Sequence, residues 1–181
     1  NTCSAGDFCW GDGRIDRFTL EGDDIEHAGV AFVYEPGTEV DCAEDDSGTP
    51  GQVGTCALNG IAFSPDGSRL YVDDDSYDWL HAFAVNEDGS LDFLAEGGST
   101  FAHGLAVSED GRYVYNGDIV NDVQGDEPVY VTGGNGGNST TIVEVAGEQV
   151  LLSTDSTSGL AAYDLVDPAA PAVITNLPVG T

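Results

Sequence analysis

Two related stretches decide the fold: NGIAFSPDGSRLYV at residues 59–72 and HGLAVSEDGRYVY at residues 103–115. The first begins at residue 59 and the second at residue 103, which gives a repeat of 44 residues. Each stretch contains a short apolar strand, a turn with Asp-Gly, and a second strand in which apolar residues alternate. A repeat of about 44 residues built from short strands is typical of one blade of a β-propeller, a four-stranded sheet that needs neighbours to cover its faces.

The same pattern extends to both sides of these stretches. Residues 80–85 and 91–94 supply a third and a fourth strand around an Asp-Gly turn, which completes a blade over residues 59–101. We expect a partial blade at 1–58, a blade with an insertion at 102–140, and further blade strands at 141–181. In the partial blade, residues 14–20 and the chain from Ile25 match a third and a fourth strand, with Phe18 at the position of Phe83, and the first two strands are missing.

The sequence therefore predicts an all-β protein, a β-propeller of four-stranded antiparallel blades. About four repeats of this length fit in 181 residues, the lower limit for a closed propeller. One explanation is that an N-terminal segment has been removed. The explanation we favour is an incomplete portion, about three to four blades, of a larger propeller whose other blades are missing here or come from another chain.

The composition is strongly acidic, with 33 Asp and Glu residues, four Arg and no Lys, and a formal net charge of −29. Such a surface repels nucleic acid and anionic membranes, so neither is an expected partner. The charges are spread along apolar strand patterns, which indicates a folded chain. Their mutual repulsion predicts stabilisation by salt or by bound cations, as in a halophilic or calcium-containing setting.

Four cysteines form two close pairs in the sequence, Cys3 with Cys9 and Cys42 with Cys56. Their spacing matches no metal or haem motif, so we expect two disulfides, for which three connectivities are possible. Disulfides predict a secreted, periplasmic or cell-surface protein. The Asn138-Ser139-Thr140 sequon agrees with this location. No segment approaches the roughly 20 apolar residues of a membrane span, and no signal peptide is recognised.

Aligning the two repeats at 44 residues places Asp74 over Asp118 and Asp78 over Asp122, just after the second strand of each blade. The same alignment places His103 opposite Asn59, before the first strand. In a propeller these positions lie on one face, at the mouth of the central channel. We therefore expect all six residues to gather there, with the Asp-Gly turns on the opposite face.

The carboxylates at this face are candidate calcium ligands because calcium takes six to eight oxygen ligands in flexible geometry. The candidates are Asp73, Asp74, Asp75, Asp78, Asp118 and Asp122. The alternative is that these residues end strands and shape turns. His103 is a candidate catalytic base or ligand, and the alternative is a hydrogen bond to the backbone of a neighbouring blade. No nucleophile elbow, zinc-protease motif or phosphate-binding loop occurs, and no cofactor other than calcium is expected.

The segments SPDGSRLYV (64–72) and SEDGRYVY (108–115) resemble the repeat of YVTN and lactonase-type propellers. The segment YDLVDPAAP (163–171) is similar to the LVIVD repeat of cell-surface propellers. The lactonase resemblance implies that His103 is a catalytic residue and Asp118 a site residue. Val123 stands where that family places an arginine, and the family would use that arginine to hold an anionic lactone.

Two classes of function follow from the sequence. The first is an extracellular acidic propeller that acts as a binding or structural module, with a protein partner or the remaining blades. The second is a lactonase-like hydrolase with its site at the channel mouth, acting through His103 or a metal-bound water. The absence of a paired catalytic constellation favours the first class, and the small-molecule substrate of the second is not defined by the sequence.

Overall fold

The computed structural model describes residues 14–33, 58–74, 78–100, 104–134, 137–155 and 159–177. All regular structure in these ranges is β. The first sheet contains β1 (Arg14–Glu21) and β2 (Asp24–Val33). The second contains β3 (Leu58–Phe63), β4 (Arg69–Asp74), β5 (Trp79–Val85) and β6 (Leu91–Gly97). The third contains β7 (Ala106–Val107), β8 (Tyr113–Asn116), β9 (Ile119–Asp122) and β10 (Val129–Thr132). The fourth contains β11 (Ser139–Val145), β12 (Glu148–Asp155), β13 (Gly159–Asp164) and β14 (Ala172–Leu177).

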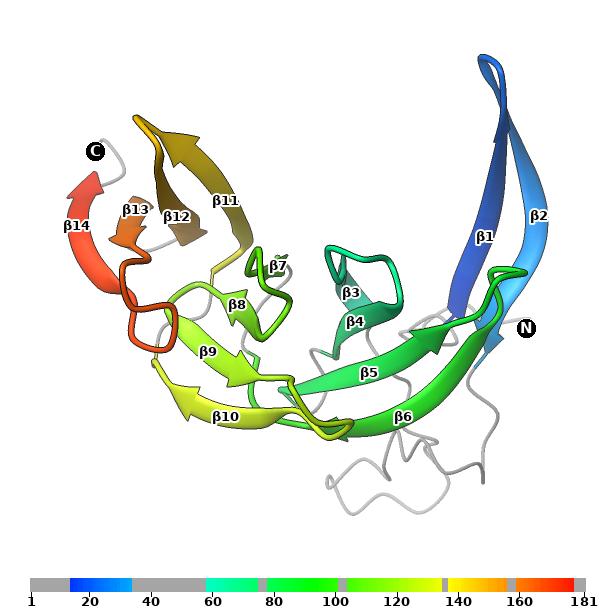
Figure 1. Cartoon of the computed structure of the whole chain (residues 1–181), viewed down its shortest axis with the longest axis horizontal. Coiled ribbons are helices and arrows are strands. Elements are labelled where there is room, and N and C mark those ends of the chain that lie inside the picture. Colours follow the sequence, from blue (N-terminus) through cyan, green and yellow to red (C-terminus); the bar gives the residue numbers. More distant parts are fainter. Residues whose placement is uncertain are drawn as a thin grey trace, which may run out of the picture.

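Each sheet is an antiparallel meander in chain order, and the sheets follow one another in an open arc (Figure 1). The first strands of the last three sheets lie on the concave side, where β3 contacts β7 and β7 contacts β11. This confirms the predicted all-β architecture of four-stranded blades. Within the predicted blade at 102–140, β10 forms the fourth strand of the third sheet. None of the described residues forms a helix long and apolar enough to cross a membrane.

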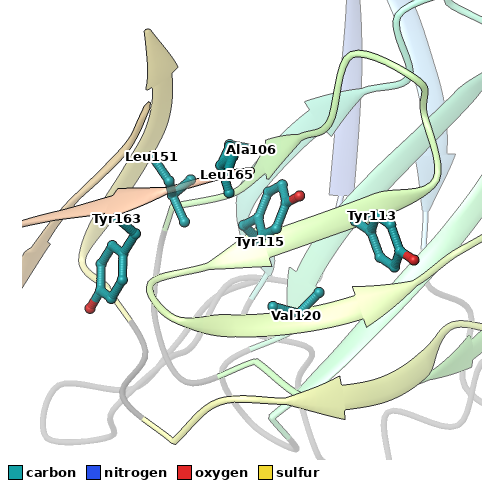
Figure 2. Packing of buried hydrophobic residues seen from close by; sticks show 7 residues of the cluster. All are labelled: Ala106, Tyr113, Tyr115, Val120, Leu151, Tyr163 and Leu165. Carbon is teal, nitrogen blue, oxygen red and sulfur yellow. The ribbon is translucent and has the colours of Figure 1, made fainter. Parts of the chain in front are cut away.

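Apolar residues that alternate along the strands fill the spaces between neighbouring sheets, because successive side chains point to opposite faces. Between the first and second sheets lie Leu70, Val72 and Phe83, with Ile15 and Phe32 against them. Between the second and third sheets lie Tyr71, Leu80, Ala82, Leu105, Val114 and Val123. Between the third and fourth sheets lie Ala106, Tyr113, Tyr115, Val120, Leu151, Tyr163 and Leu165 (Figure 2). The core is thus a series of layers, each shared by two sheets.

Two arginines add polar links between sheets. The Arg17 guanidinium on β1 donates to the backbone carbonyl of Asp88 in the turn between β5 and β6. The Arg69 guanidinium on β4 donates to the carbonyl of Val123 at 3.3 Å and to Asp126 Oδ1 at 3.0 Å. These arginines therefore hold neighbouring sheets together, since each of them reaches an adjacent sheet or its connection.

The Asp-Gly turns are built by a repeated set of hydrogen bonds around one carboxylate. The Ser64 hydroxyl donates to Asp66 Oδ1 at 2.6 Å, and the amide and hydroxyl of Ser68 donate to the same oxygen at 3.0 and 2.8 Å. Gly67 has a φ of 72°, a conformation that strains any residue with a Cβ atom. The hydrogen bond from the Ser64 hydroxyl, followed by those from Ser68, lowers the pKa of Asp66 to about 2. The turn is therefore built around an ionised aspartate.

The third sheet repeats this turn. The Ser108 hydroxyl donates to Asp110 Oδ1 at 2.6 Å, and the amide of Arg112 donates to the same oxygen at 3.0 Å. The Ser108 hydroxyl is the largest cause of a lowered pKa at Asp110. The agreement between the two turns confirms the hairpins that the sequence predicts.

Ser64→Ala is expected to raise the pKa of Asp66, because it removes the strongest of the hydrogen bonds that favour the carboxylate. An unfolded aspartate titrates near pH ~4, so the stabilisation from Asp66 is present above that pH and is lost as the pH falls toward about 2. The variant should lose less stability over this interval than the unmodified chain does. Carboxyl-carbon NMR titration measures the pKa, and urea unfolding at about pH 5 and about pH 3 measures the stability.

Ser108→Ala is the matched control, since it should raise the pKa of Asp110 and leave Asp66 unchanged. If Asp66 titrates identically in the Ser64→Ala variant and in the unmodified chain, the turn hydrogen bonds do not set its pKa.

Phe18 and Phe83 align in the repeat but have different surroundings. Phe18 is exposed and Phe83 is buried. The Phe18 ring lies edge-on to the His27 ring, with 5.3 Å between their centroids. Phe83 instead packs against Phe32 of the neighbouring hairpin. The difference arises because the described part of the chain contains no sheet that covers Phe18.

Candidate functional site

Five of the candidate carboxylates fall within the described residues: Asp73, Asp74, Asp78, Asp118 and Asp122. His103, the candidate catalytic residue, and Asp75 lie outside them. All four cysteines also lie outside the described ranges, so the predicted disulfides remain a prediction.

Asp73 and Asp74 end strand β4 and are both buried. Being consecutive in a strand, they point to opposite faces of the second sheet. The register agrees: Asp73 pairs with Leu80, whose side chain packs toward the third sheet, whereas Asp74 pairs with Trp79. These two carboxylates therefore do not converge on one ion.

Asp74 instead belongs to a buried polar cluster with His81. His81 Nε2 lies 3.2 Å from Asp74 Oδ2, and His81 Nδ1 lies 3.7 Å from Glu96 Oε2. His81 and Asp74 are each 1 % exposed, and Glu96 is 23 % exposed. The imidazole lies between the two carboxylates and hydrogen-bonds that of Asp74. The cluster ties the second, third and fourth strands of the sheet together.

Asp78 and Asp118 lie in the connections between the second and third strands of their sheets. Asp78 has a φ of 56°, and its carbonyl accepts from the amide of Thr100 at 2.8 Å. Asp118 Oδ1 accepts from the amide of Gly134 at 3.0 Å. Both residues therefore attach this connection to the segment that leaves the fourth strand. The two positions match the predicted end of the blade.

Asp122 does not lie with them, and this part of the predicted face is wrong. In the ladder between β8 and β9, Asn116 pairs with Ile119 and Tyr113 pairs with Asp122, so Asp122 is at the opposite end of the sheet from Asp118. The two sheets differ in where the second strand ends. β8 ends at Asn116 and the chain turns at once, whereas β4 continues for two residues beyond Val72, the residue aligned with Asn116. The connection that follows β4 is also longer.

At that opposite end, Asp122 forms an ion pair with Arg112. Arg112 Nη2 lies 2.9 Å from Asp122 Oδ2, and Arg112 Nε lies 3.1 Å from the same oxygen. Partial burial opposes ionisation of Asp122, but the amide of Gln124 and the Arg112 guanidinium outweigh it and lower the pKa of this carboxyl. Asp122 therefore caps the end of β9.

Across the ranges that the structure describes, no group of three or more His, Cys, Asp or Glu residues is arranged to hold a metal ion. The carboxylates that the sequence groups as calcium ligands are separated between two faces and two ends of the sheets. Asp75 lies outside the described ranges, so the calcium site that the sequence predicts stays a prediction.

The polar residues that join neighbouring sheets were not predicted from the sequence. Asn121 is fully buried on β9, and its side chain accepts from the amide of Ser99 and donates to the carbonyl of Ser99, both at 2.8 Å. The amide of Gly117 donates to Thr140 Oγ1 at 2.9 Å. No strand was predicted over residues 119–122, so nothing in the sequence indicated that this amide side chain would be buried and would need partners.

No protein-family model and no curated protein matches this sequence. Solved structures do match. The chain is similar to the periplasmic gluconolactonase PpgL of Pseudomonas aeruginosa, with 16% identity and a TM-score of 0.57 over 94% of this chain and 52% of that one. A proposed 6-phosphogluconolactonase of Bacteroides uniformis gives 16% identity and a TM-score of 0.58 over 92% and 52%.

The fold is part of a β-propeller. Hydrazine synthase of Kuenenia stuttgartiensis also matches, with 15% identity and a TM-score of 0.50 over 76% of this chain and 40% of that one. The chain spans about half the length of the two lactonase structures. At these identities the likeness establishes the propeller architecture, and the activities named for those proteins remain theirs.

Proposed function

We propose that this chain acts as a structural and binding module built on part of an acidic β-propeller. The observation that carries the proposal is the use of the candidate carboxylates. Asp74 binds His81, Asp118 binds the amide of Gly134, and Asp122 binds Arg112. Each of these side chains has a partner within the fold, which supports a role in holding the blades rather than in a reaction.

We also propose a location outside the cytoplasm, in a secreted, periplasmic or surface-bound protein. The support is the presence of four cysteines that form two close pairs in the sequence, a spacing that predicts disulfides. Alkylation without reduction should add no label to the purified chain, and alkylation after reduction should add four, as read by intact mass. Labelling of all four cysteines without reduction would count against an oxidising compartment.

A second candidate function is lactone hydrolysis. Its support is the fold similarity to two proteins named as lactonases, together with the repeat resemblance that makes His103 a candidate base. The rate of hydrolysis of glucono-δ-lactone and of 6-phosphogluconolactone distinguishes the two functions. The structural module is expected to hydrolyse neither probe above the rate of the buffer.

His103→Ala and His27→Ala form the matched pair for that assay. His27 is half exposed on β2 and bonds Asp16 at 2.7 Å, away from the sheets that carry the repeat. Hydrolysis that is lost in His103→Ala and kept in His27→Ala would replace the structural role by a catalytic one. Hydrolysis that survives both substitutions would indicate a contaminating enzyme and leave the structural role in place.

A further inference from the structure

Residues 138–140 carry a modification motif that the proposed function does not use. Asn138, Ser139 and Thr140 form the sequence Asn-x-Ser/Thr, the acceptor for N-linked glycosylation, and the middle residue is not proline. No other asparagine of the sequence is followed by Ser or Thr at the second position. The motif begins one residue before β11 and includes the first two residues of that strand. The sequence thus offers one acceptor of this kind.

The acceptor residue is exposed on a segment that is otherwise held closely against the fourth sheet. Gly137 is buried, Asn138 is exposed and Thr140 is 7 % exposed. A Cβ atom at Gly137 would collide with Ser153 Oγ on β12. The backbone amide of Asn138 donates to the carbonyl of Thr154 at 2.7 Å, which fixes the backbone and leaves the side chain at the surface. The Asn138 side chain is therefore accessible to a bulky polar group.

Thr140, whose hydroxyl completes the motif, is used by the fold itself. Thr140 Oγ1 accepts from the amide of Gly117 at 2.9 Å, and this bond links the third sheet to the fourth. In the ladder between β11 and β12, Ser139 pairs with Thr154 and Thr140 pairs with Ser153. A transferase that reads the motif must contact both the asparagine amide and the hydroxyl. In the folded chain that hydroxyl is buried, and the segment that carries it is fixed in a sheet.

The motif lies at the end of the sheets where the inner strands begin. Gly104 precedes β7, and a Cβ atom at Gly104 would lie 2.5 Å from Ser139 Cα. Gly117, which donates to Thr140, lies in the connection between β8 and β9 at the same end. This is the end at which the sequence placed the mouth of the channel. A glycan on Asn138 would therefore stand beside the mouth, at the end opposite to the Asp-Gly turns.

We propose that Asn138 carries an N-linked glycan, and that the glycan is added before β11 joins the fourth sheet. The donor is a lipid-linked oligosaccharide diphosphate. Asn138 Nδ2 forms a bond to C1 of the first sugar and loses one proton, while the bond from C1 to the phosphate oxygen breaks and the lipid diphosphate leaves. The timing follows because Thr140 is accessible only until the third and fourth sheets pack. The inference rests on the location outside the cytoplasm that is proposed above.

Asn138→Gln and Thr140→Ser test the site. The full chain is secreted from a host that glycosylates its exported proteins, and intact mass is measured before and after an amidase that releases N-linked glycans. The unmodified chain is expected to carry one glycan, whose release converts Asn138 to Asp. Thr140→Ser is the matched control, because it keeps the hydroxyl and should keep the glycan. Asn138→Gln should lose the glycan. A chain with the mass of its sequence alone, or a glycan that persists in Asn138→Gln, would overturn the site.

Cell-free synthesis of the full chain tests the timing. A purified transferase and its lipid-linked donor are added either during synthesis or after the chain has folded. We expect the yield of glycosylated chain to be about tenfold or more lower in the second case, because Thr140 is then reached only through local opening of β11. Equal yields for the two orders of addition would show that the folded chain is an acceptor and would overturn the timing.

The state of the cysteines separates this inference from the location on which it rests. In protein purified from its natural source, we expect one glycan on Asn138 together with cysteines that are labelled only after reduction. Oxidised cysteines with an unmodified Asn138 would reject the glycan and keep the location. Cysteines that are labelled without reduction, with no glycan, would reject both.

Discussion

Phe83→Ala is expected to lower the free energy of unfolding by about 3–5 kcal/mol, the range for removing a buried aromatic ring from a core. Phe83 is 1 % exposed. Its ring lies 4.8 Å from that of Phe32 and 5.7 Å from that of Phe93, both in edge-to-face geometry. It is thus the ring that joins the β1–β2 hairpin to the second sheet.

The substitution should destabilise the β1–β2 hairpin more than the rest of the protein. A two-stranded hairpin is marginally stable by itself, so β1 and β2 depend on Ile15 and Phe32 packing against the second sheet. Removing the Phe83 ring should therefore accelerate hydrogen exchange in β1 and β2 more than in the third and fourth sheets. Urea unfolding followed by circular dichroism measures the overall change.

Phe63→Ala is the control for this effect. It removes the same ring from the same sheet, but from a side chain that is largely exposed, so the expected change is below about 1 kcal/mol. Equal destabilisation by the two substitutions would show that the contact between the hairpin and the second sheet is not carried by Phe83.

The architecture could be predicted because its signals are local. An Asp-Gly turn between alternating apolar residues specifies a hairpin by itself, and the 44-residue offset between Ser64 and Ser108 repeats that hairpin. The Ser-Asp hydrogen bonds in both turns show the physical basis of the motif. Sheet order followed because sequential antiparallel strands pair with their neighbours.

The candidate site could not be predicted to the same degree, because its geometry depends on connections rather than on repeats. An offset of 44 aligns Asp78 with Asp122, but the connection after β8 is shorter than the one after β4. A strand of a few residues spans the sheet from one end to the other, so Asp122 lies at the opposite end of the third sheet from Asp118. The partners of Asn121 and His81 are likewise set by tertiary contacts that leave no periodic signal in the sequence.

Tyr115→Ala is expected to lower the free energy of unfolding by about 3–5 kcal/mol, because it removes a buried ring from the apolar layer between the third and fourth sheets. Tyr115 is fully buried among Val120, Leu151 and Tyr163 (Figure 2). Its hydroxyl donates to the carbonyl of Pro168 at 3.0 Å, which links the third sheet to the turn between β13 and β14. Burial raises the pKa of this hydroxyl, so it stays a donor at neutral pH.

Tyr115→Phe separates the ring from the hydroxyl and should cost about 1 kcal/mol, the usual net value of one hydrogen bond. Tyr71→Phe is the matched variant, because Tyr71 occupies the same repeat position and is also fully buried. The hydroxyl of Tyr71 has no hydrogen-bond partner within the described chain. Removing it should therefore be neutral or stabilising, since a buried polar group without a partner costs free energy. If both Tyr→Phe variants lose the same stability in urea unfolding, the bond to Pro168 contributes nothing, and the fourth sheet is held by apolar packing alone.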